Sequence, residues 1–444
     1  MIDISPELAA ALMMGLVMVG VLTGFPLAIP IGGVAVIFGF LLFGTGSIEI
    51  ISGRVFSLVT NYTLLAVPAF IFMGGMLQHS GIAEKMYDAL YVWLGGLRGG
   101  LAIITVLIGT IMAACVGVIA ASITMLAMVA LPAMLTRGYD KGLASGSVVA
   151  GGCLGILIPP SIMLVIYGPM AWISVGKLFM AAFFPGFTLS ALYCAYIAIR
   201  SYLQPRVAPS IPPEERRMPF LKKTILLITS LAPTAILILA VLGVIFLGIA
   251  APTEASATGA FVATLLAIAY RRFNFEVLKE TAIATLKLTS MILLIGSCAF
   301  AFVGVFLSAG CGNVVEELIL GTPGGRWGAF ASVMFIVFLL GFFIDWIGIL
   351  FIIVPIISPL APALGFDPLW FAMMICVNLQ MSFMTPPFAP GIFFLRGTAS
   401  KELGLTMADI IRGVIPFIFL VFIGLALCVI FPQIILWLPG QMIK

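Results

Sequence analysis

The sequence predicts an all-α polytopic membrane protein, and its composition and hydropathy pattern carry that prediction. Of the 444 residues, 63% are hydrophobic and 9% are charged, whereas about 25% of the residues of a typical soluble domain are charged. Apolar stretches recur from Leu8 to Leu438, and each is about twenty residues long, enough to cross a hydrocarbon core roughly 30 Å thick as a helix. A lipid-exposed backbone must satisfy its own hydrogen bonds, so these stretches are expected to be helices.

About ten of these stretches are expected to cross the membrane completely. The first follows an acidic start, and a second comes straight after it, so it is expected to be a retained helix rather than a signal peptide. The expected crossings lie near residues 8–25, 27–44, 61–80, 142–172, 178–200, 224–250, 253–270, 288–309, 367–396 and 413–438.

Two further apolar stretches, near 101–135 and 328–363, are too long for one straight crossing and short for two. Both are expected to be re-entrant hairpins. Their centres, at residues 117–122 and 341–345, are places where a helix can break. An ordinary kinked crossing is the alternative for each.

The basic residues test this layout. If the linker that starts at Arg200 is cytoplasmic, the positive-inside rule is satisfied by seventeen of the 21 Lys and Arg residues, and both termini are expected to be periplasmic. The expected periplasmic residues are Arg54, Lys177, Arg326 and Lys444. The expected cytoplasmic residues are Lys85, Arg98, Arg137, Lys141, Arg200, Arg206, Arg216, Arg217, Lys222, Lys223, Arg271, Arg272, Lys279, Lys287, Arg396, Lys401 and Arg412.

The two halves of the chain share a spaced motif. Gly138 precedes the first residue of a Pro-Pro pair, Pro159, by 21 residues, and Gly365 precedes Pro386 of a second pair by the same 21 residues. Both glycines and both pairs are therefore related by an offset of 227. The same offset relates two further prolines near the ends of the expected hairpins, Pro132 and Pro359.

This offset predicts two repeats, residues 1–203 and 224–444, joined by a cytoplasmic linker at 204–223 that is rich in proline and charge. Each repeat would contain three crossings, a hairpin, a Pro-Pro-broken helix and a closing crossing. Five crossings per repeat would invert the second copy, and paired broken helices in inverted repeats are typical of secondary transporters. Duplication for packing alone is the alternative.

The Pro-Pro pairs also indicate where a site would lie. Proline removes a backbone donor and leaves carbonyl groups and helix ends free at membrane depth, where an ion or a carboxylate can satisfy them. Each nearby hydroxyl or amide could instead bond back to the backbone. The oxygen donors near the two breaks are Ser122, Thr124, Ser161, Asn378, Ser382 and Thr385.

Four other features bear on function. Asp345 is the only ionisable residue of the second hairpin, and an aspartate at the membrane centre costs at least about 2.5 kcal/mol, so it is read either as an ion or substrate contact or as a turn residue that reaches water. Glu254 is expected to stabilise a helix N-terminus. With one histidine, His79, expected at a helix end, and no Cys/His cluster, an intramembrane enzyme is a remote alternative.

With these motifs, the chain resembles the large, DctM-type membrane subunit of the tripartite ATP-independent periplasmic (TRAP) transporters over nearly its whole length. The stretch Phe388 to Gly391 departs from the pattern, since many relatives place a glycine soon after the second Pro-Pro pair. Residues 117–122 and 395–397 look closer to a branch associated with 2-oxo acids and other monocarboxylates. The resemblance rests on residues 66–74, 98–101, 131–134, 137–139, 158–161, 251–255, 367–368, 378 and 385–387.

The resemblance implies an elevator-type transporter of the bacterial inner membrane, driven by sodium, that takes up a small organic acid. It implies two partners, a small four-helix DctQ-type membrane subunit and a periplasmic DctP-type binding protein. A stand-alone sodium/anion symporter is the nearest alternative. The expected sodium ligands are Gly117, Ser122, Thr124, Pro159, Asn378 and Thr385, and the expected substrate contacts are Ser122, Ser161, Asp345 and Ser382.

Overall fold

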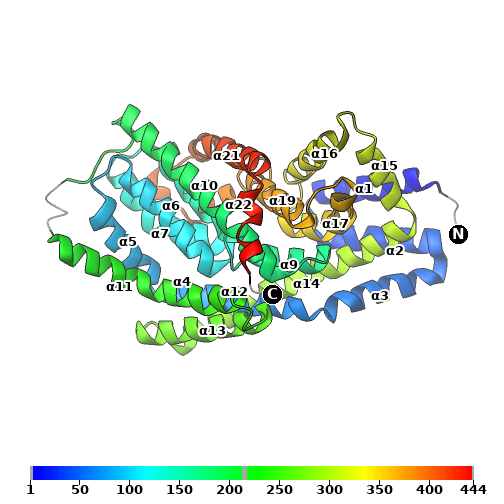
Figure 1. Cartoon of the computed structure of the whole chain (residues 1–444), viewed down its shortest axis with the longest axis horizontal. Coiled ribbons are helices and arrows are strands. Elements are labelled where there is room, and N and C mark those ends of the chain that lie inside the picture. Colours follow the sequence, from blue (N-terminus) through cyan, green and yellow to red (C-terminus); the bar gives the residue numbers. More distant parts are fainter. Residues whose placement is uncertain (1–3, 213–217, 443–444) are drawn as a thin grey trace.

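The computed structural model describes residues 4–212 and 218–442, and within these residues all regular structure is helical. The N-terminus lies at one end of an elongated body (Figure 1). Three charges that entered the orientation argument, Arg216, Arg217 and Lys444, lie outside the described residues.

The first half of the chain consists of short and long helices in series. They are α1 (Pro6–Leu22), α2 (Ala28–Phe43), α3 (Ser47–Val59), α4 (Ala66–His79), α5 (Ile82–Leu94), α6 (Gly100–Val116), α7 (Ile119–Thr136), α8 (Lys141–Cys153), α9 (Ile162–Ala171) and α10 (Val175–Leu203).

The second half is likewise a series of helices. Its helices are α11 (Phe220–Ile238), a π-helical turn (Leu239–Gly243), α12 (Val244–Phe246), α13 (Pro252–Ala269), α14 (Phe275–Ser308), α15 (Cys311–Leu320), α16 (Gly325–Leu340), α17 (Trp346–Ile357), α18 (Leu360–Ala363), α19 (Pro368–Ser382), α20 (Pro390–Thr398), α21 (Met407–Ile430) and α22 (Gln433–Leu436).

Both Pro-Pro pairs interrupt a helix, as predicted. The first break separates α8 and the 3₁₀ turn Leu154–Ile156 from α9, and the second separates α19 from α20. The peptide bonds Pro159–Pro160 and Pro386–Pro387 are both cis. At the offset of 227, Lys141 at the start of α8 corresponds to Pro368 at the start of α19.

The two predicted hairpins are helix pairs with a break at the predicted place. Gly117, with a φ of 64°, ends α6, and α7 begins two residues later. In the second pair, residues 341–345 separate α16 from α17. The glycine at 117 is required because its left-handed conformation is rarely open to other residues.

Several crossings differ from the prediction at their ends. The expected crossing at 288–309 starts at Phe275, because the Asn274 side chain caps that end by accepting from Val277 N at 2.7 Å. The crossing expected at 413–438 is α21, which starts earlier at a capping box formed by Thr406 and Asp409, and ends before Pro432. The linker expected at 204–223 gives way to α11 at Phe220.

The prediction missed three helices because it searched for apolar crossings. Residues 47–59, 82–94 and 311–320 form α3, α5 and α15, and each carries charged residues. Charges such as Glu49, Glu84 and Glu316 rule out an ordinary crossing but allow a helix with one apolar face.

The described part of the expected linker is packed against the rest of the protein. Val207 O accepts from Asp140 N at 2.8 Å, and Ile211 N donates to Gly95 O at 2.9 Å. Ala208 and Ile211 are buried. Residues 207–211 therefore pack against the base of the first hairpin.

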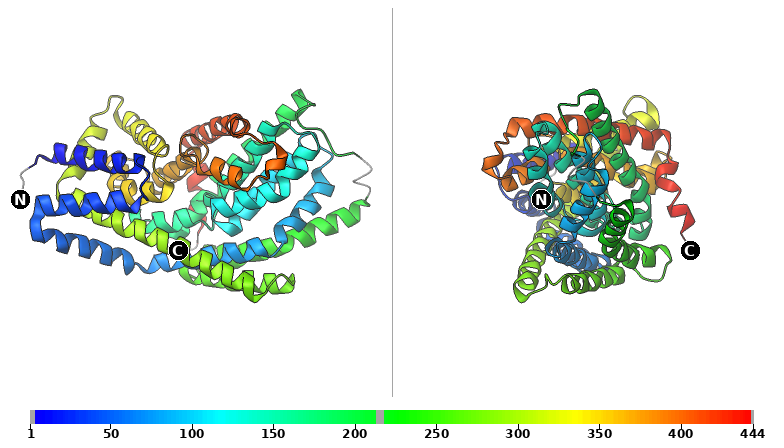
Figure 2. Two further views of the ribbon diagram at one scale, coloured as in Figure 1. Left: turned by 180° about the vertical axis from the view of Figure 1, so that it is seen from behind. Right: turned by 90° about the vertical axis from the view of Figure 1, so that its left-hand side faces the viewer.

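Helices α4, α11, α13 and α14 gather along one edge of the body, and the hairpins and broken helices lie on the other side of this edge together with α1, α10 and α21 (Figures 1 and 2). α14 packs against α2, α3 and α4, and α4 packs against α13. α14 also contacts α17 of the second hairpin. This edge therefore holds one continuous layer against which the hairpins lie.

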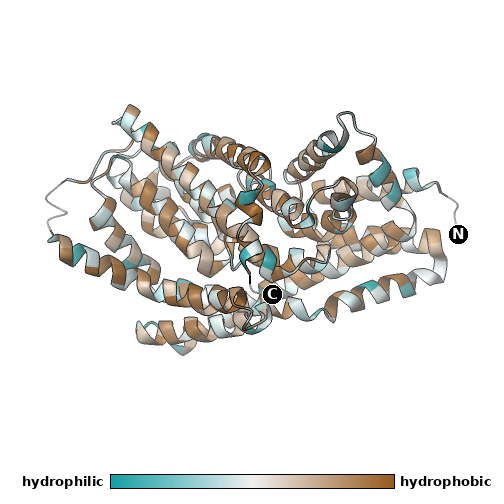
Figure 3. Ribbon diagram, in the orientation of Figure 1, coloured by the Kyte–Doolittle hydropathy of each residue, from teal (hydrophilic) through white to brown (hydrophobic). Residues whose placement is uncertain are grey.

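Most helices consist largely of hydrophobic residues (Figure 3). Seven helical segments of the described residues are long and apolar enough to cross a membrane, and the shorter apolar helices are α1, α6, α9, α16, α17 and α19. Large apolar side chains stand exposed, such as Phe261 on α13 and Phe419 on α21. This surface is what a multi-pass membrane protein presents to lipid.

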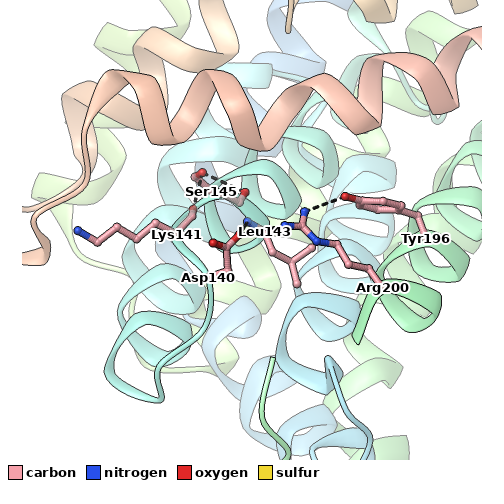
Figure 4. Close-up of polar contacts among 7 residues, drawn as sticks. Asp140, Lys141, Leu143, Ser145, Tyr196 and Arg200 are labelled. Atoms are coloured by element: carbon pink, nitrogen blue, oxygen red, sulfur yellow. Dashed lines mark hydrogen bonds and ion pairs between the residues drawn. The ribbon is translucent and has the colours of Figure 1, made fainter. Parts of the chain in front are cut away.

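A polar cluster joins three segments near the start of α8 (Figure 4). Asp140 caps α8 by accepting from Leu143 N at 2.9 Å, and Arg200 of α10 pairs with Asp140 at 3.3 Å and donates to Tyr196 Oη at 2.8 Å. Lys141 Nζ donates to Gly404 O at 2.6 Å. The ion pair is partly exposed, so it contributes at most about 1 kcal/mol.

Candidate functional site

A cavity of about 430 Å³ lies where both hairpin turns and both helix breaks meet. Its walls are formed by the first hairpin turn, the second hairpin turn, both sides of the first break, the start of α20, one face of α14 and the turn before α2. Its volume suits a small organic molecule. The lining residues are Pro26, Leu27, Ala28, Ile71, Gly117, Val118, Ile119, Ala120, Ile156, Ile162, Leu288, Met291, Ile292, Leu294, Ile295, Asp345, Trp346, Ile347, Phe388, Pro390 and Phe394.

Four helix N-termini converge on this cavity. The first residues of α7, α9, α17 and α20, which are Ile119, Ile162, Trp346 and Pro390, all line it. No side-chain cap hydrogen bond is made at any of the four ends. Helix N-termini carry free N–H groups and a partial positive charge, so this arrangement favours an anionic group.

Asp345 is the one ionisable residue among those that line the cavity. It occupies the N-cap position of α17, where its side chain makes no cap hydrogen bond. The positive end of α17 lowers the cost of a carboxylate at this depth. Asp345 therefore lies in the second hairpin turn and lines the cavity.

The first hairpin meets the first break at Ser122. Its Oγ is fully buried and has no hydrogen-bond partner. The facing residue is Gly155, where an added Cβ would lie 2.9 Å from that Oγ, and Pro160 O lies 3.3 Å from the Cβ position of Gly117. Pro159 is buried beside them. A free hydroxyl and carbonyl oxygens therefore gather at this contact.

The second hairpin meets the second break in a related way. Ser382 Oγ is buried without a partner and packs directly against Gly341. Asn378 Nδ2 donates to Met334 O of α16 at 2.7 Å, which leaves its Oδ1 available as an acceptor. Each contact between a hairpin and a broken helix thus contains one unpartnered serine hydroxyl, from the hairpin in the first contact and from the broken helix in the second.

The remaining predicted oxygen donors bond to nearby protein groups. Ser161 donates to Ile156 O, and Thr385 donates to Met381 O at 2.7 Å. Thr124 of α7 and Thr398 of α20 lie 3.3 Å apart and link the first hairpin to the second broken helix. A hydroxyl that donates to a carbonyl keeps its oxygen lone pairs free to accept.

The structure brings only part of the predicted set to one place. Gly117 and Asp345 line the cavity. Ser122, Asn378, Ser382 and Thr124 lie in contacts between a hairpin helix and a broken helix, whereas Ser161 and Thr385 bond back to their own segments and Pro159 is buried at the first break. Where the family pattern is broken, Ala389 adopts a φ of 26°, and a Cβ on Gly391 would lie 2.9 Å from Phe383 O. That glycine still permits the close approach.

Sequence reasoning missed the wall that α14 contributes. Leu288, Met291, Ile292 and Ile295 recur at spacings of three and four and form one helix face. The spacing can be seen in the sequence, but an apolar face that lines a cavity cannot be distinguished from one that packs or faces lipid when the whole helix is apolar. Gln380 of α19 was also missed, and both polar atoms of its buried side chain lack a partner.

Glu254 and His79 lie at helix ends, as predicted. Glu254 Oε2 accepts from Ala251 N at 3.0 Å at the start of α13, and His79 lies in the last turn of α4. The seven cysteines are free. The described residues contain no group of three His, Cys, Asp or Glu side chains arranged to hold a metal ion.

A sequence model described as "Tripartite ATP-independent periplasmic transporter, DctM component" matches residues 14–434. The chain belongs to this family. Its members are named as permease subunits rather than enzymes, and this chain is accordingly a transporter subunit and a multi-pass membrane protein. The family resemblance inferred from the sequence motifs is confirmed.

Three curated relatives illustrate the range of the family. The chain is 29% identical to the C4-dicarboxylate TRAP transporter large permease protein DctM of Pseudomonas aeruginosa, covering 90% of this chain and 91% of that protein. It is 28% identical to the ectoine permease TeaC of Halomonas elongata, covering 95% and 97%. It is also 28% identical to the sialic acid permease SiaM of Vibrio cholerae, covering 96% of each.

Two solved structures share the fold of this DctM-family chain. The YdaH transporter of Alcanivorax borkumensis superposes with a TM-score of 0.64 at 15% identity, covering 96% of this chain and 99% of that chain. MtrF of Neisseria gonorrhoeae superposes with a TM-score of 0.54 at 13% identity, covering 98% and 96%. Both are membrane transporters, so the predicted fold class is confirmed.

Proposed function

We propose that this DctM-family permease carries a small organic acid into the cell by sodium-driven secondary transport. The observation that carries the proposal is the convergence of two hairpin turns and two helix breaks on one 430 Å³ cavity. Paired broken helices at a common site are the arrangement by which secondary transporters hold a substrate near the bilayer midplane.

The cavity supports an organic acid with one carboxylate and an apolar body. Four uncapped helix N-termini offer N–H groups to the carboxylate, while aliphatic and aromatic side chains form most of the remaining wall. The relatives are named for C4-dicarboxylates, ectoine and sialic acid. Because no Lys, Arg or His lines this cavity, a second carboxylate would lack a cationic partner, which supports a monocarboxylate such as a 2-oxo acid.

The contacts between hairpins and breaks support sodium as the coupling ion. Sodium takes carbonyl and hydroxyl oxygens, and Ser122 and Ser382 each present a buried hydroxyl that no protein group satisfies. The free Oδ1 of Asn378, Thr385, Thr124 and the carbonyls near Gly117 and Pro159 complete the proposed ligand set. Ser161 and Asp345 lie closer to the proposed substrate.

The architecture proposed for transport is a pair of inverted repeats, residues 1–203 and 224–444, joined by the segment 204–223. The hairpins and broken helices would move as one body against the layer formed by α4, α11, α13 and α14, as an elevator. The charge distribution supports both termini on the periplasmic side of the bacterial inner membrane.

Membership in the family implies two partners. We propose a small four-helix membrane subunit, for which the exposed apolar helices offer a surface, and a periplasmic binding protein that delivers the acid. The chain would also bind the organic acid as its substrate and contact the lipid bilayer.

The test is uptake of radiolabelled organic acids into proteoliposomes that contain all three purified subunits. Uptake of a 2-oxo or other monocarboxylic acid is expected under an inward sodium gradient and should vanish when the gradient is collapsed. Uptake driven equally well by a proton gradient alone would overturn the sodium assignment, and uptake without the binding protein would overturn the tripartite mechanism.

A further inference from the structure

A second cavity, of about 510 Å³, lies away from the central one. One wall comes from α3 and α14, and the other comes from the end of α9 and from the segment between α17 and α19. Trp172, which lines it, is 96% exposed, so this cavity opens to the surroundings.

The α3 wall of this cavity is polar. Arg54, Ser57 and Asn61 all line it, at spacings of three and four that place them on one side of the chain as α3 ends. Asn61 Oδ1 is used to accept from Thr63 N at 3.1 Å, so its amide NH₂ group remains to donate. Ser358 from the opposite wall has an Oγ without a partner.

Arg54 is the one ionisable residue among those that line the cavity. Its side chain lies over α14, where an added Cβ on Gly304 would be 2.6 Å from Arg54 Cγ. The absence of a side chain at Gly304 therefore makes room for the arginine stem. No carboxylate lines the cavity with it, so a guanidinium faces an otherwise neutral space that is large enough for a small acid.

The two cavities have opposite charge. The central cavity is lined by one carboxylate, Asp345, and by no cationic side chain, whereas the second is lined by one guanidinium and by no acid. Arg54 is one of the four basic residues that the charge rule assigns to the periplasmic side. The cavity it lines is thus on the side from which substrate arrives.

We propose that this second cavity is an outer binding site for a small carboxylate, held by Arg54 with Ser57 and Asn61 before it reaches the central cavity. A guanidinium binds a carboxylate through two parallel hydrogen bonds. The inference rests on the proposed function, because it assumes that the solute is an organic acid. It adds a recognition residue outside the hairpins and breaks.

The experiment compares Arg54→Gln, Arg54→Lys and a control, Lys177→Gln, in proteoliposomes with all three subunits. Lys177 is the matched control because it is exposed, has the same assigned side and lines neither cavity. At an acid concentration well below half-saturation, Arg54→Gln should slow uptake about tenfold or more, the loss expected for one charge-assisted hydrogen bond. Arg54→Lys should retain part of the rate, and Lys177→Gln should match the native protein.

A second variant tests the same site in case Arg54→Gln fails to fold. Asn61→Asp keeps a capping oxygen and adds a negative charge beside Arg54, so it should slow uptake while the thermal unfolding midpoint stays native. Native rates in both Arg54→Gln and Asn61→Asp would overturn the proposal. Weaker binding of the binding protein, with native uptake once that protein saturates, would also overturn it and make Arg54 a docking residue.

These outcomes separate the outer site from the proposed function. If the native assembly takes up no organic acid, the proposed function fails. If native uptake is normal and the Arg54 and Asn61 variants behave like Lys177→Gln, only the outer site fails.

Discussion

Ser122 and Gly155 meet so closely that a Cβ on Gly155 would lie 2.9 Å from the Ser122 hydroxyl oxygen. Ser122 belongs to α7 of the first hairpin, and Gly155 belongs to the turn that leads into the first break. The hydroxyl is buried and unpartnered. The contact therefore joins the hairpin part and the helix-break part of the proposed sodium site, and a substitution at either residue can disturb it.

The substitution Gly155→Ala is expected to push the hairpin off the break. Overpacking a tight interior contact costs about 1–3 kcal/mol, so the thermal unfolding midpoint of the purified protein should fall and sodium-driven uptake should decrease. Gly397→Ala on α20 is the control, because no atom lies within 4 Å of its Cβ position. An unchanged midpoint and unchanged uptake in Gly155→Ala would show that Ser122 can move aside without loss of stability or transport.

The substitution Ser122→Ala removes the oxygen without adding volume. Since the hydroxyl has no protein partner, stability without sodium should stay native or rise. Loss of one oxygen ligand should raise the sodium concentration for half-maximal uptake about tenfold. The control is Ser201→Ala, which removes another buried, unpartnered hydroxyl that lies outside both cavities. The same sodium dependence in both variants would remove Ser122 from the ligand set.

The parts of the fold that depend on local chemistry could be predicted from the sequence. The Pro-Pro pairs that begin at Pro159 and Pro386 mark the two breaks because two consecutive residues lack a backbone donor, whereas single prolines such as Pro185 lie inside helices. Gly117 fixes the first turn because few other residues adopt its backbone angles. Helices α3, α5 and α15 could not be found by the same means, because their amphipathic pattern does not distinguish them from surface segments.

The site was harder to predict than the fold because tertiary packing decides what faces a cavity. Asp345 was identified by its charge in an apolar hairpin, and it lines the central cavity. Asn378 and Thr385 were identified by their distance from a break along the chain, yet neither lines that cavity, since Asn378 donates to Met334 O of α16 and Thr385 donates back to Met381 O of its own segment. Leu288 and Arg54 lie far from any break in the sequence, so nothing local pointed to them.

Asp345→Asn tests the carboxylate while preserving the N-cap, because asparagine caps helices about as well as aspartate. The protein should fold normally, and uptake should fall at least tenfold if the charge helps hold the coupling ion or orient the substrate. Asp367→Asn is the matched control, since Asp367 caps α19 by accepting from Leu369 N and Trp370 N but lies outside the cavity. Equal uptake in the two variants would show that Asp345 matters only as the residue at the N-cap position of α17.

Removing sodium should lower the stability of the purified protein. A ligand present at 100 times its dissociation constant stabilises the native state by about 2.7 kcal/mol, so replacing sodium by choline at constant ionic strength should lower the unfolding midpoint by several degrees. Potassium should not restore the midpoint. Ser122→Ala should show a smaller sodium effect than native protein, and an equal effect of potassium and sodium would contradict a specific site.

The proposed orientation can be tested by labelling cysteines introduced into exposed positions. Asn313→Cys on α15 and Glu402→Cys after α20 are exposed, and the charge distribution places them on the periplasmic and cytoplasmic sides respectively. A maleimide reagent that does not cross membranes should label Asn313→Cys in spheroplasts, whereas Glu402→Cys should react only after lysis. The native chain is the background control, because most of its seven cysteines are buried. The reverse pattern would place the basic linker outside the cell, and Arg54, with the outer cavity it lines, would then face the cytoplasm.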